Sequence, residues 1–210
     1  MWNGKTTYQV NEIFNSVQGE GWQAGRLATF IRLQGCTVGC PWCDTKYTWK
    51  AGGTRMTVDE IVNQVAWDWV VITGGEPTMY NLDDLIGALR AQGRGVQLET
   101  SGQYNLKGLL VPDWITWSPK ANLGFECQLK IVHEVKIVVD EKLEWETVED
   151  LAGKYYNCKW SLMPEGCPPS QESIDKAYGF LSRVGSHHEL KAWISRWKFS
   201  DRLQWRMGVK

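Results

Sequence analysis

Trp69-Val70-Val71-Ile72-Thr73-Gly74-Gly75-Glu76-Pro77 joins an uncharged, mostly β-branched run to a glycine turn. Such a run is typical of a strand that is buried on both faces, as strands of parallel sheets are. The paired glycines let another group approach the backbone, because no Cβ stands in the way. Ligands of parallel sheets collect at the carboxyl ends of the strands. The stretch therefore predicts a central strand of an α/β fold with a binding site just beyond it.

Strand-like and helix-like segments alternate on both sides of this stretch. Thr57 and Glu60 form a capping box for a helix over 57–65, and Asn81 is placed to cap a second helix that carries apolar residues on one face. Further strands are predicted at 27–33, 95–100, 114–118, 134–139 and 160–163, and a further helix at about 171–182.

This alternation predicts a parallel α/β sheet, which right-handed crossovers curl into an open or partial barrel. The connection from Thr100 to Pro112 is too short and too rich in glycine for a full helix. We therefore expect a partial (β/α) barrel of mostly parallel strands, trimmed of some helices, in a single domain over residues 1–210. Glycine or polar clusters follow four of the strands, and they are predicted to line one rim; they lie at 74–77, 99–102, 118–120 and 163–166.

Three cysteines lie close together in Gly35-Cys36-Thr37-Val38-Gly39-Cys40-Pro41-Trp42-Cys43-Asp44. Three thiolates spaced Cys-x3-Cys-x2-Cys can bind three irons of a four-iron, four-sulfur (4Fe-4S) cluster and leave the fourth iron open to a substrate or cosubstrate. A structural zinc site uses four N or S ligands, usually as two pairs, and no histidine lies within eighty residues of the loop. A disulfide would leave an odd thiol. The spacing therefore favours a catalytic cluster.

The composition fits one domain of ordinary globular type, with 210 residues, 43% hydrophobic and 22% charged. The net charge of -1 gives no electrostatic reason to bind nucleic acid or an anionic membrane, and no apolar run approaches the length of a bilayer span. Residues 1–5 show no signal peptide, so we expect a cytoplasmic protein with reduced thiols. Cys127, Cys158 and Cys167 are scattered; they are expected to be buried or incidental, with a second cluster as the alternative.

The cysteine spacing together with Gly74-Gly75-Glu76-Pro77 resembles the radical S-adenosylmethionine (SAM) superfamily. More narrowly, the chain resembles the 7-carboxy-7-deazaguanine synthases of deazapurine (preQ0 and queuosine-type) biosynthesis. The segments that separate this family from its superfamily relatives are Gln18-Gly19-Glu20-Gly21 and Cys43-Asp44-Thr45. The likeness runs, with gaps, from about residue 8 to residue 166, through the stretches 12–21, 30–36, 40–45, 71–77, 98–102 and 118–120.

The resemblance implies a reaction. Reductive cleavage of SAM yields a 5′-deoxyadenosyl radical, which abstracts hydrogen from 6-carboxy-5,6,7,8-tetrahydropterin. The ring contracts, ammonia leaves and 7-carboxy-7-deazaguanine forms. The implied cofactors are a 4Fe-4S cluster, SAM and Mg²⁺. The implied partners are the small pterin, an external reductant such as flavodoxin or ferredoxin, and a second copy in a homodimer, with which the 13 tryptophans are compatible.

The resemblance also assigns residues to ligands. Cys36, Cys40 and Cys43 would bind the cluster, and Thr45 would bind magnesium, which prefers oxygen. The SAM contacts would be Trp42, Cys43, Asp44, Gly75, Glu76, Ser118, Pro119, Lys120, Met163, Pro164, Glu165 and Gly166, with the Glu76 carboxylate a candidate partner for the SAM amine. The substrate contacts would be Val17, Gln18, Gly19, Glu20, Arg32 and Thr73. Here an amide and a carboxylate suit a pterin edge, and Arg32 suits the substrate carboxylate. A surface salt bridge is the alternative for Arg32, and a turn hydroxyl for Thr45.

The C-terminus departs from the resemblance. Family members often end in a tail that carries Gln and His-Lys-Tyr and closes over the substrate. Arg202-Leu203 lines up with the start of that tail, but no histidine follows, and His187-His188 lies too early to replace it. No terminal contact to the pterin is therefore assigned. Two other functions stay open: a glycyl-radical activating enzyme that acts on a protein, and a non-catalytic iron–sulfur or zinc protein.

Overall fold

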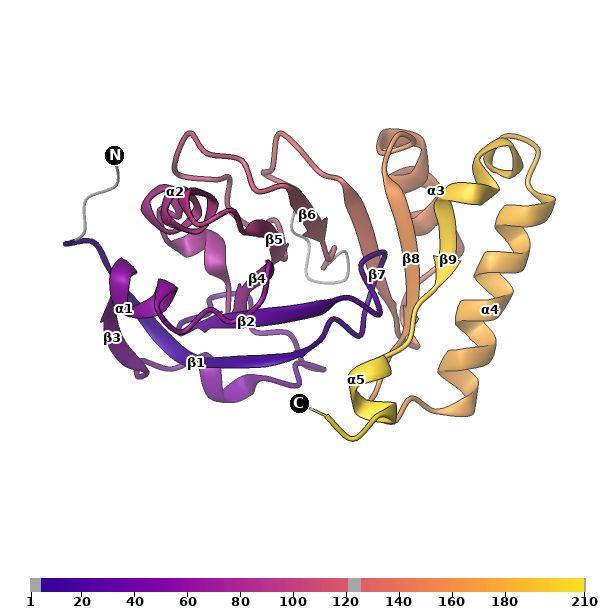
Figure 1. The fold of residues 1–210 in the computed structure, drawn as a ribbon. Helices are drawn as coiled ribbons and strands as arrows, with labels where there is room; N and C mark the ends of the chain where they lie inside the picture. Colours follow the sequence, from indigo (N-terminus) through magenta and orange to yellow (C-terminus); the bar gives the residue numbers. More distant parts are fainter. Residues whose placement is uncertain (1–4, 121–125, 210) are drawn as a thin grey trace.

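The computed structural model describes residues 5–120 and 126–209, and these form one open sheet of nine strands (Figure 1). Its order is β3-β1-β2-β4-β5-β6-β7-β8-β9. From β2 to β9 all neighbours are parallel, whereas β1 is antiparallel to both β2 and β3. The strands are β1 (Thr7–Val17), β2 (Leu27–Leu33), β3 (Thr54–Thr57), β4 (Trp69–Gly74), β5 (Gly95–Thr100), β6 (Trp114–Trp117), β7 (Glu134–Val139), β8 (Lys159–Pro164) and β9 (Trp197–Phe199). The predicted partial barrel of mostly parallel strands is confirmed.

The helices are few. They are α1 (Val58–Val62), α2 (Asp83–Ala91), α3 (Trp145–Lys154), α4 (Gln171–Ser186) and α5 (Leu203–Arg206), with 3-10 turns η1 (Lys46–Thr48), η2 (Pro77–Met79) and η4 (Leu190–Arg196). In the described part of the chain, the links from β5 to β6 and from β6 to β7 carry no helix. The barrel is therefore trimmed of helices, as the Gly-rich connection after Thr100 predicts.

The two faces of the sheet differ because successive side chains of a strand point to opposite sides. In β7, Val135, Ile137 and Val139 belong to the main hydrophobic core, which also takes in the buried faces of α1 to α4. Lys136 and Val138, on the opposite side of the same strand, line a cavity. The helix-covered face thus holds the core, and the other face holds the candidate site.

Several local predictions hold in detail. Thr57 and Glu60 form the expected capping box, although α1 ends at Val62 rather than at residue 65. The Asn81 side chain accepts a hydrogen bond from the Asp83 backbone at 3.0 Å, one residue outside the N-cap of α2. The helix predicted over 171–182 extends to Ser186. The elements β1, β3, α3, β9 and α5 were not predicted, although α3 buries Trp145, Val148 and Ala152 at helical spacing.

No helix in residues 5–120 and 126–209 is long and apolar enough to cross a membrane. Residues 1–4, which carry most of the expectation that no signal peptide is present, lie outside the described residues.

Candidate active site

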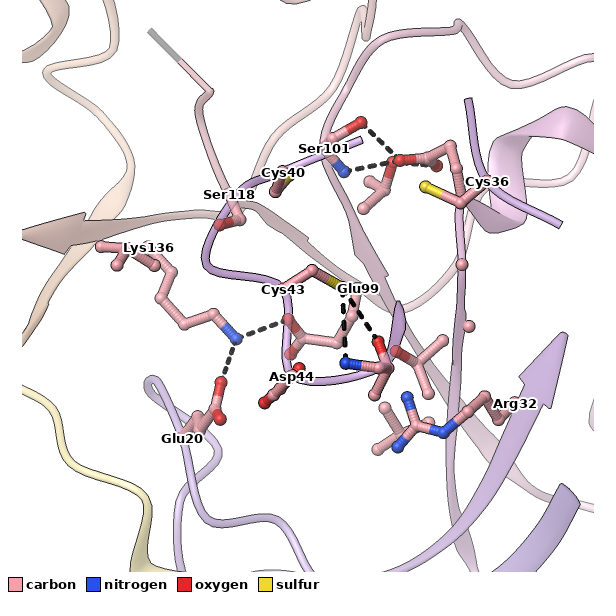
Figure 2. Close-up of a pocket in the computed structure, with 18 of the residues that line it drawn as sticks. Glu20, Arg32, Cys36, Cys40, Cys43, Asp44, Glu99, Ser101, Ser118 and Lys136 are labelled. Atoms are coloured by element: carbon pink, nitrogen blue, oxygen red, sulfur yellow. Dashed lines mark hydrogen bonds and ion pairs between the residues drawn. The ribbon is translucent and has the colours of Figure 1, made fainter. Parts of the chain in front are cut away.

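A cavity on the face of the sheet opposite the main core brings most of the predicted site residues together (Figure 2). Of the predicted set, it is lined by Val17, Gln18, Gly19, Glu20, Arg32, Cys36, Cys40, Trp42, Cys43, Asp44, Thr45, Thr73, Gly75, Glu76, Ser118, Lys120 and Met163. Pro119 lines a small adjoining pocket together with Trp42. Pro164, Glu165 and Gly166 line neither pocket. The strand-end clusters therefore do share one rim, but the 163–166 turn reaches it only through Met163.

The cysteine loop is held against the glycine turn by the backbone. The Gly75 amide donates to the Leu33 carbonyl at 3.1 Å, and the Glu76 amide donates to the Gly35 carbonyl at 2.9 Å. A Cβ on Gly75 would lie 2.8 Å from the Cβ of Cys36, closer than real Cβ atoms approach. The glycine at this position is thus required for the two loops to pack, in addition to any approach by a ligand.

The donor chemistry of the loop fits an iron–sulfur cluster. Cys36, Cys40 and Cys43 are free thiols, Cys40 buried and the other two half-buried. Burial raises the pKa of the Cys36 and Cys40 thiols, whereas a bound iron holds its thiol ligands deprotonated. The Thr45 amide donates to the Cys43 sulfur at 3.4 Å, as amides do around cluster ligands. Among the described residues, no three His, Cys, Asp or Glu side chains meet at one point that a single ion would occupy.

Glu76 is buried on the cavity wall, with 1% of its surface exposed. One carboxylate oxygen accepts hydrogen bonds from the Thr78 amide and hydroxyl and from the Thr100 hydroxyl, at 3.0, 2.6 and 2.6 Å. The other accepts from the amide and hydroxyl of Ser101. Five protein donors therefore fix this carboxylate and tie η2 to the end of β5. Its contact with the SAM amine stays a prediction.

An ion-pair network lies deeper in the cavity, where Lys136 reaches between Glu20 and Glu99 (Figure 2). The Lys136 Nζ is 2.8 Å from a carboxylate oxygen of each. Gln18 and Gln97 donate to the other oxygen of Glu99 at 3.2 and 2.7 Å. The sequence analysis placed Glu99 in the 99–102 rim cluster but assigned it no ligand, and it did not single out Lys136. The available signal for Lys136 was a charged residue between Val135 and Ile137 in a predicted strand.

The two carboxylates are not equivalent. Burial alone would raise the pKa of Glu20, but the charges of Lys136 and Arg202 outweigh it and lower the pKa to about 2. For Glu99, burial outweighs Lys136, the nearby Glu134 adds to the effect, and the pKa is raised. Burial opposes the charged form of Lys136, but its two carboxylate partners raise its pKa. Glu20 is thus firmly ionised, and Glu99 is the carboxylate that protonates more readily.

The loop that follows β1 lies against the cavity side of β5 to β8. Gln18 bonds to Glu99 and Glu20 bonds to Lys136, as described above. The Trp22 amide donates to Glu134 at 3.0 Å, and its indole donates to the Trp160 carbonyl at 3.0 Å. Glu134 is fully buried and also accepts from Ser161 at 2.7 Å. These bonds fix the loop and aim Gln18 and Glu20 into the cavity.

Arg32 lies inside the cavity rather than on the surface. Its Nε donates to Glu12 at 2.7 Å, with both side chains about one-sixth exposed (15% and 17%). Its other guanidinium nitrogens make no hydrogen bond to the described residues. Thr73 is its register partner on the neighbouring strand β4. The salt bridge of the alternative is therefore present, although it is largely withdrawn from solvent, and two nitrogens of Arg32 remain available to an anionic ligand.

The C-terminal segment reaches the cavity, contrary to expectation. Arg202 and Gln204 are among its lining residues. The Leu203 amide donates to the Gly19 carbonyl at 3.0 Å, and the Gln204 amide group donates to Glu20 at 3.4 Å. Local sequence patterns did not predict these contacts, because the tail lacks the family's histidine and the partners lie far apart in the chain. His187 instead pairs with Glu149 at the end of α4, at 2.7 Å.

The remaining cysteines take no part in this cavity. Cys158 is buried, Cys127 is half-buried and Cys167 is exposed, and the cavity is lined by none of them.

Comparison with known proteins shows the family to which the chain belongs. The model of the radical SAM superfamily matches residues 30–115, which include the cysteine loop and the glycine turn. The 7-carboxy-7-deazaguanine synthase of Synechocystis sp. is 45% identical over 150 residues, which cover 68% of this chain and 71% of that protein. The chain belongs to the 7-carboxy-7-deazaguanine synthase family. The synthase of Flavobacterium psychrophilum is 35% identical over 168 residues, covering 75% of this chain and 79% of that protein.

The family likeness extends to the whole fold. A crystal structure of QueE from Escherichia coli superposes with a TM-score of 0.75 at 28% identity, covering 95% of this chain and 96% of that one. As a 7-carboxy-7-deazaguanine synthase family member, the chain is a radical SAM enzyme of deazapurine biosynthesis, for which a 4Fe-4S cluster, SAM and a small-molecule substrate are implied. The glycyl-radical and non-catalytic alternatives are set aside.

Proposed function

We propose that the chain converts 6-carboxy-5,6,7,8-tetrahydropterin into 7-carboxy-7-deazaguanine and ammonia, with Mg²⁺ as a further cofactor. The observation that carries this proposal is a single cavity with a cysteine loop on one wall and a polar array on another. That array contains Gln18, Glu20 and Arg32. Reductive cleavage of SAM at the bound cluster supplies the radical chemistry.

The residues of the cavity suit a flat, carboxylated heterocycle. Phe14 and Phe30 stack with their rings 5.0 Å apart and 5° from parallel, and both line the cavity. Gln18 and Glu20 offer amide and carboxylate groups to the donors and acceptors of a pterin edge. The two open nitrogens of Arg32 suit the substrate carboxylate. Together these side chains would orient the pterin ring and hold it at a fixed position relative to the cysteine loop.

The other assignments complete the proposal. Trp42, Asp44, Gly75, Ser118, Lys120 and the 163–166 turn would hold SAM, and the Thr45 hydroxyl would bind Mg²⁺, a hard cation that favours oxygen. We further propose one domain over residues 1–210, a homodimer, a cytoplasmic location and an external reductant such as flavodoxin or ferredoxin. One continuous sheet with one main core supports the single domain.

The test is anaerobic reconstitution with iron and sulfide, followed by incubation with the pterin, SAM, Mg²⁺ and a reductant. We expect 5′-deoxyadenosine and 7-carboxy-7-deazaguanine to form together, detected by mass spectrometry. Omitting the pterin should abolish the deazapurine but not all SAM cleavage. Clean SAM cleavage without a deazapurine product would overturn the proposed substrate.

A further inference from the structure

One arginine contacts three segments, two that line the cavity and one beside it, that are far apart in the chain. The Arg202 Nε lies 3.2 Å from a Glu20 oxygen and 3.8 Å from an Asp44 oxygen. A terminal nitrogen of the same guanidinium donates to the Gly166 carbonyl. Glu20 belongs to the loop after β1, Asp44 follows the last cysteine, and Gly166 belongs to the turn after β8.

The Arg202 side chain is 12% exposed, and so is largely withdrawn from solvent. Its Nε is buried and makes no well-aligned hydrogen bond to any described residue, although two carboxylates lie within 4 Å. A buried donor without an aligned acceptor is costly. The Asp44 side chain is 57% exposed, so it is free to shift. A small movement of the Asp44 loop would therefore complete the hydrogen bond.

We propose that Arg202 is a positioning residue that couples SAM binding to substrate binding. This inference rests on the proposed function, in which Asp44 contacts SAM and Glu20 contacts the pterin. SAM that orders the Asp44 loop brings this carboxylate toward Arg202, and Arg202 in turn holds Glu20 in the arrangement that the pterin needs. By linkage, each ligand then raises the affinity for the other by the same factor.

Arg206 is a matched control, because it is an arginine four residues along the same segment. It pairs with Asp201, its side chain is 57% exposed, and it does not line the cavity. Arg202→Met and Arg206→Met thus remove the same group, once from within the cavity and once outside it. Arg202→Lys keeps a cation, but an ammonium cannot meet three acceptors with the planar fork of a guanidinium.

The first experiment measures the SAM dissociation constant by calorimetry, with and without the pterin, on the reconstituted enzyme in the absence of reductant. We expect the pterin to tighten SAM binding roughly fivefold or more in the wild type and in Arg206→Met. In Arg202→Met and Arg202→Lys the ratio should fall close to one. A wild-type ratio near one, or an unchanged ratio in the Arg202 variants, overturns the proposal.

The second experiment is hydrogen exchange on the protein as isolated, without ligands. Both Arg202 variants should exchange faster than the wild type in segments 18–22 and 36–45, while α2 and α4 are unchanged. Unchanged exchange in both segments overturns the proposal. This measurement does not need the pterin, so it separates failure of the coupling from failure of the proposed function, which would appear as SAM cleavage without a deazapurine. If Arg202→Met does not fold, Arg202→Lys carries both tests.

Discussion

Gly75 packs directly against Cys36, with 2.8 Å between the Cys36 Cβ and the place where a Cβ on Gly75 would lie. The glycine turn and the cysteine loop are thereby one packed unit, and the position of Cys36 depends on a residue 39 positions away in the chain.

Gly75→Ala should displace the cysteine loop, since overpacking of this kind costs about 1–3 kcal/mol locally. We expect the iron bound per chain after reconstitution to fall well below that of the wild type. Gly179→Ala in α4 is the control, because its added Cβ meets no atom within 4 Å; iron content there should be unchanged. Full iron loading of Gly75→Ala would contradict the packing argument.

Lys136→Met should destabilise the fold by about 3–5 kcal/mol, because it leaves the buried Glu99 without its cation and Glu20 with Arg202 alone. Urea unfolding of the apo-protein measures the effect. Lys154→Met removes an exposed lysine from its pair with Asp150, with both side chains over 60% exposed, and should cause no measurable change. Equal effects of the two substitutions would show that the Lys136 network contributes no more than a surface pair.

Glu20→Gln should reveal stability that depends on pH. The pKa of Glu20 is about 2 in the folded protein against an ordinary value of 4.5. Its ionised form thus contributes stability above pH 4.5, and this is lost as the pH falls toward 2. The wild type should exceed Glu20→Gln in unfolding free energy by roughly 3 kcal/mol at pH 7 and roughly 1 kcal/mol at pH 3.

The matched substitution Glu99→Gln tests the opposite pH dependence. The pKa of Glu99 is raised, so its ionised form is unfavourable in the folded state above its ordinary pKa. Glu99→Gln should cost less stability at pH 7 than Glu20→Gln. Equal costs at pH 7 would show that Glu20 is not the more firmly ionised partner of Lys136.

Arg32→Met should raise the KM for the pterin roughly 10- to 100-fold, the expected loss for charge-assisted hydrogen bonds to a carboxylate. SAM cleavage without the pterin should change little. The control is Arg55→Met on β3, where the arginine bonds Thr7 on the exposed edge of the sheet. An unchanged KM in Arg32→Met would leave Arg32 with only its structural bond to Glu12.

Thr45→Ala should raise the Mg²⁺ concentration needed for half-maximal activity by roughly tenfold or more, while the cluster is retained. The Thr45 amide bonds to the Cys43 sulfur at 3.4 Å, and alanine keeps this bond; only the longer contact of the hydroxyl with the same sulfur, at 3.5 Å, is lost. Thr45→Ser retains the hydroxyl and should behave like the wild type. Loss of iron from Thr45→Ala in proportion to activity would instead indicate a structural role for the hydroxyl.

The parts of the fold that could be predicted are those for which a few consecutive residues indicate burial or a helix end. The run at 69–73 is apolar because both faces of β4 are covered, and Thr57 with Glu60 marks a helix start by its own side chains. The cysteine loop and the glycine turn were found for the same reason, since each motif is complete within a few residues.

The parts that could not be predicted depend on pairs that only the fold brings together. Lys136 meets Glu20 across 116 positions, and no periodicity encodes that contact. Glu76 looked like a ligand-binding carboxylate, yet it is held by donors from η2 and the end of β5. Arg202 was not assigned to the site, because the C-terminal tail lacks the family's histidine. Its contacts with Glu20 and Asp44 depend on the position of the segment that follows β9.

The alternation of residues along β7 has a consequence for how such an enzyme changes over evolutionary time. A point substitution at Val138 alters the cavity without touching the packed side of the sheet. A deletion of one residue would exchange the two sides, placing Val135 and Ile137 in the cavity and forcing charges among the helices. Substitutions on the cavity side can therefore change specificity step by step, whereas a change in the length of such a strand would disrupt the fold.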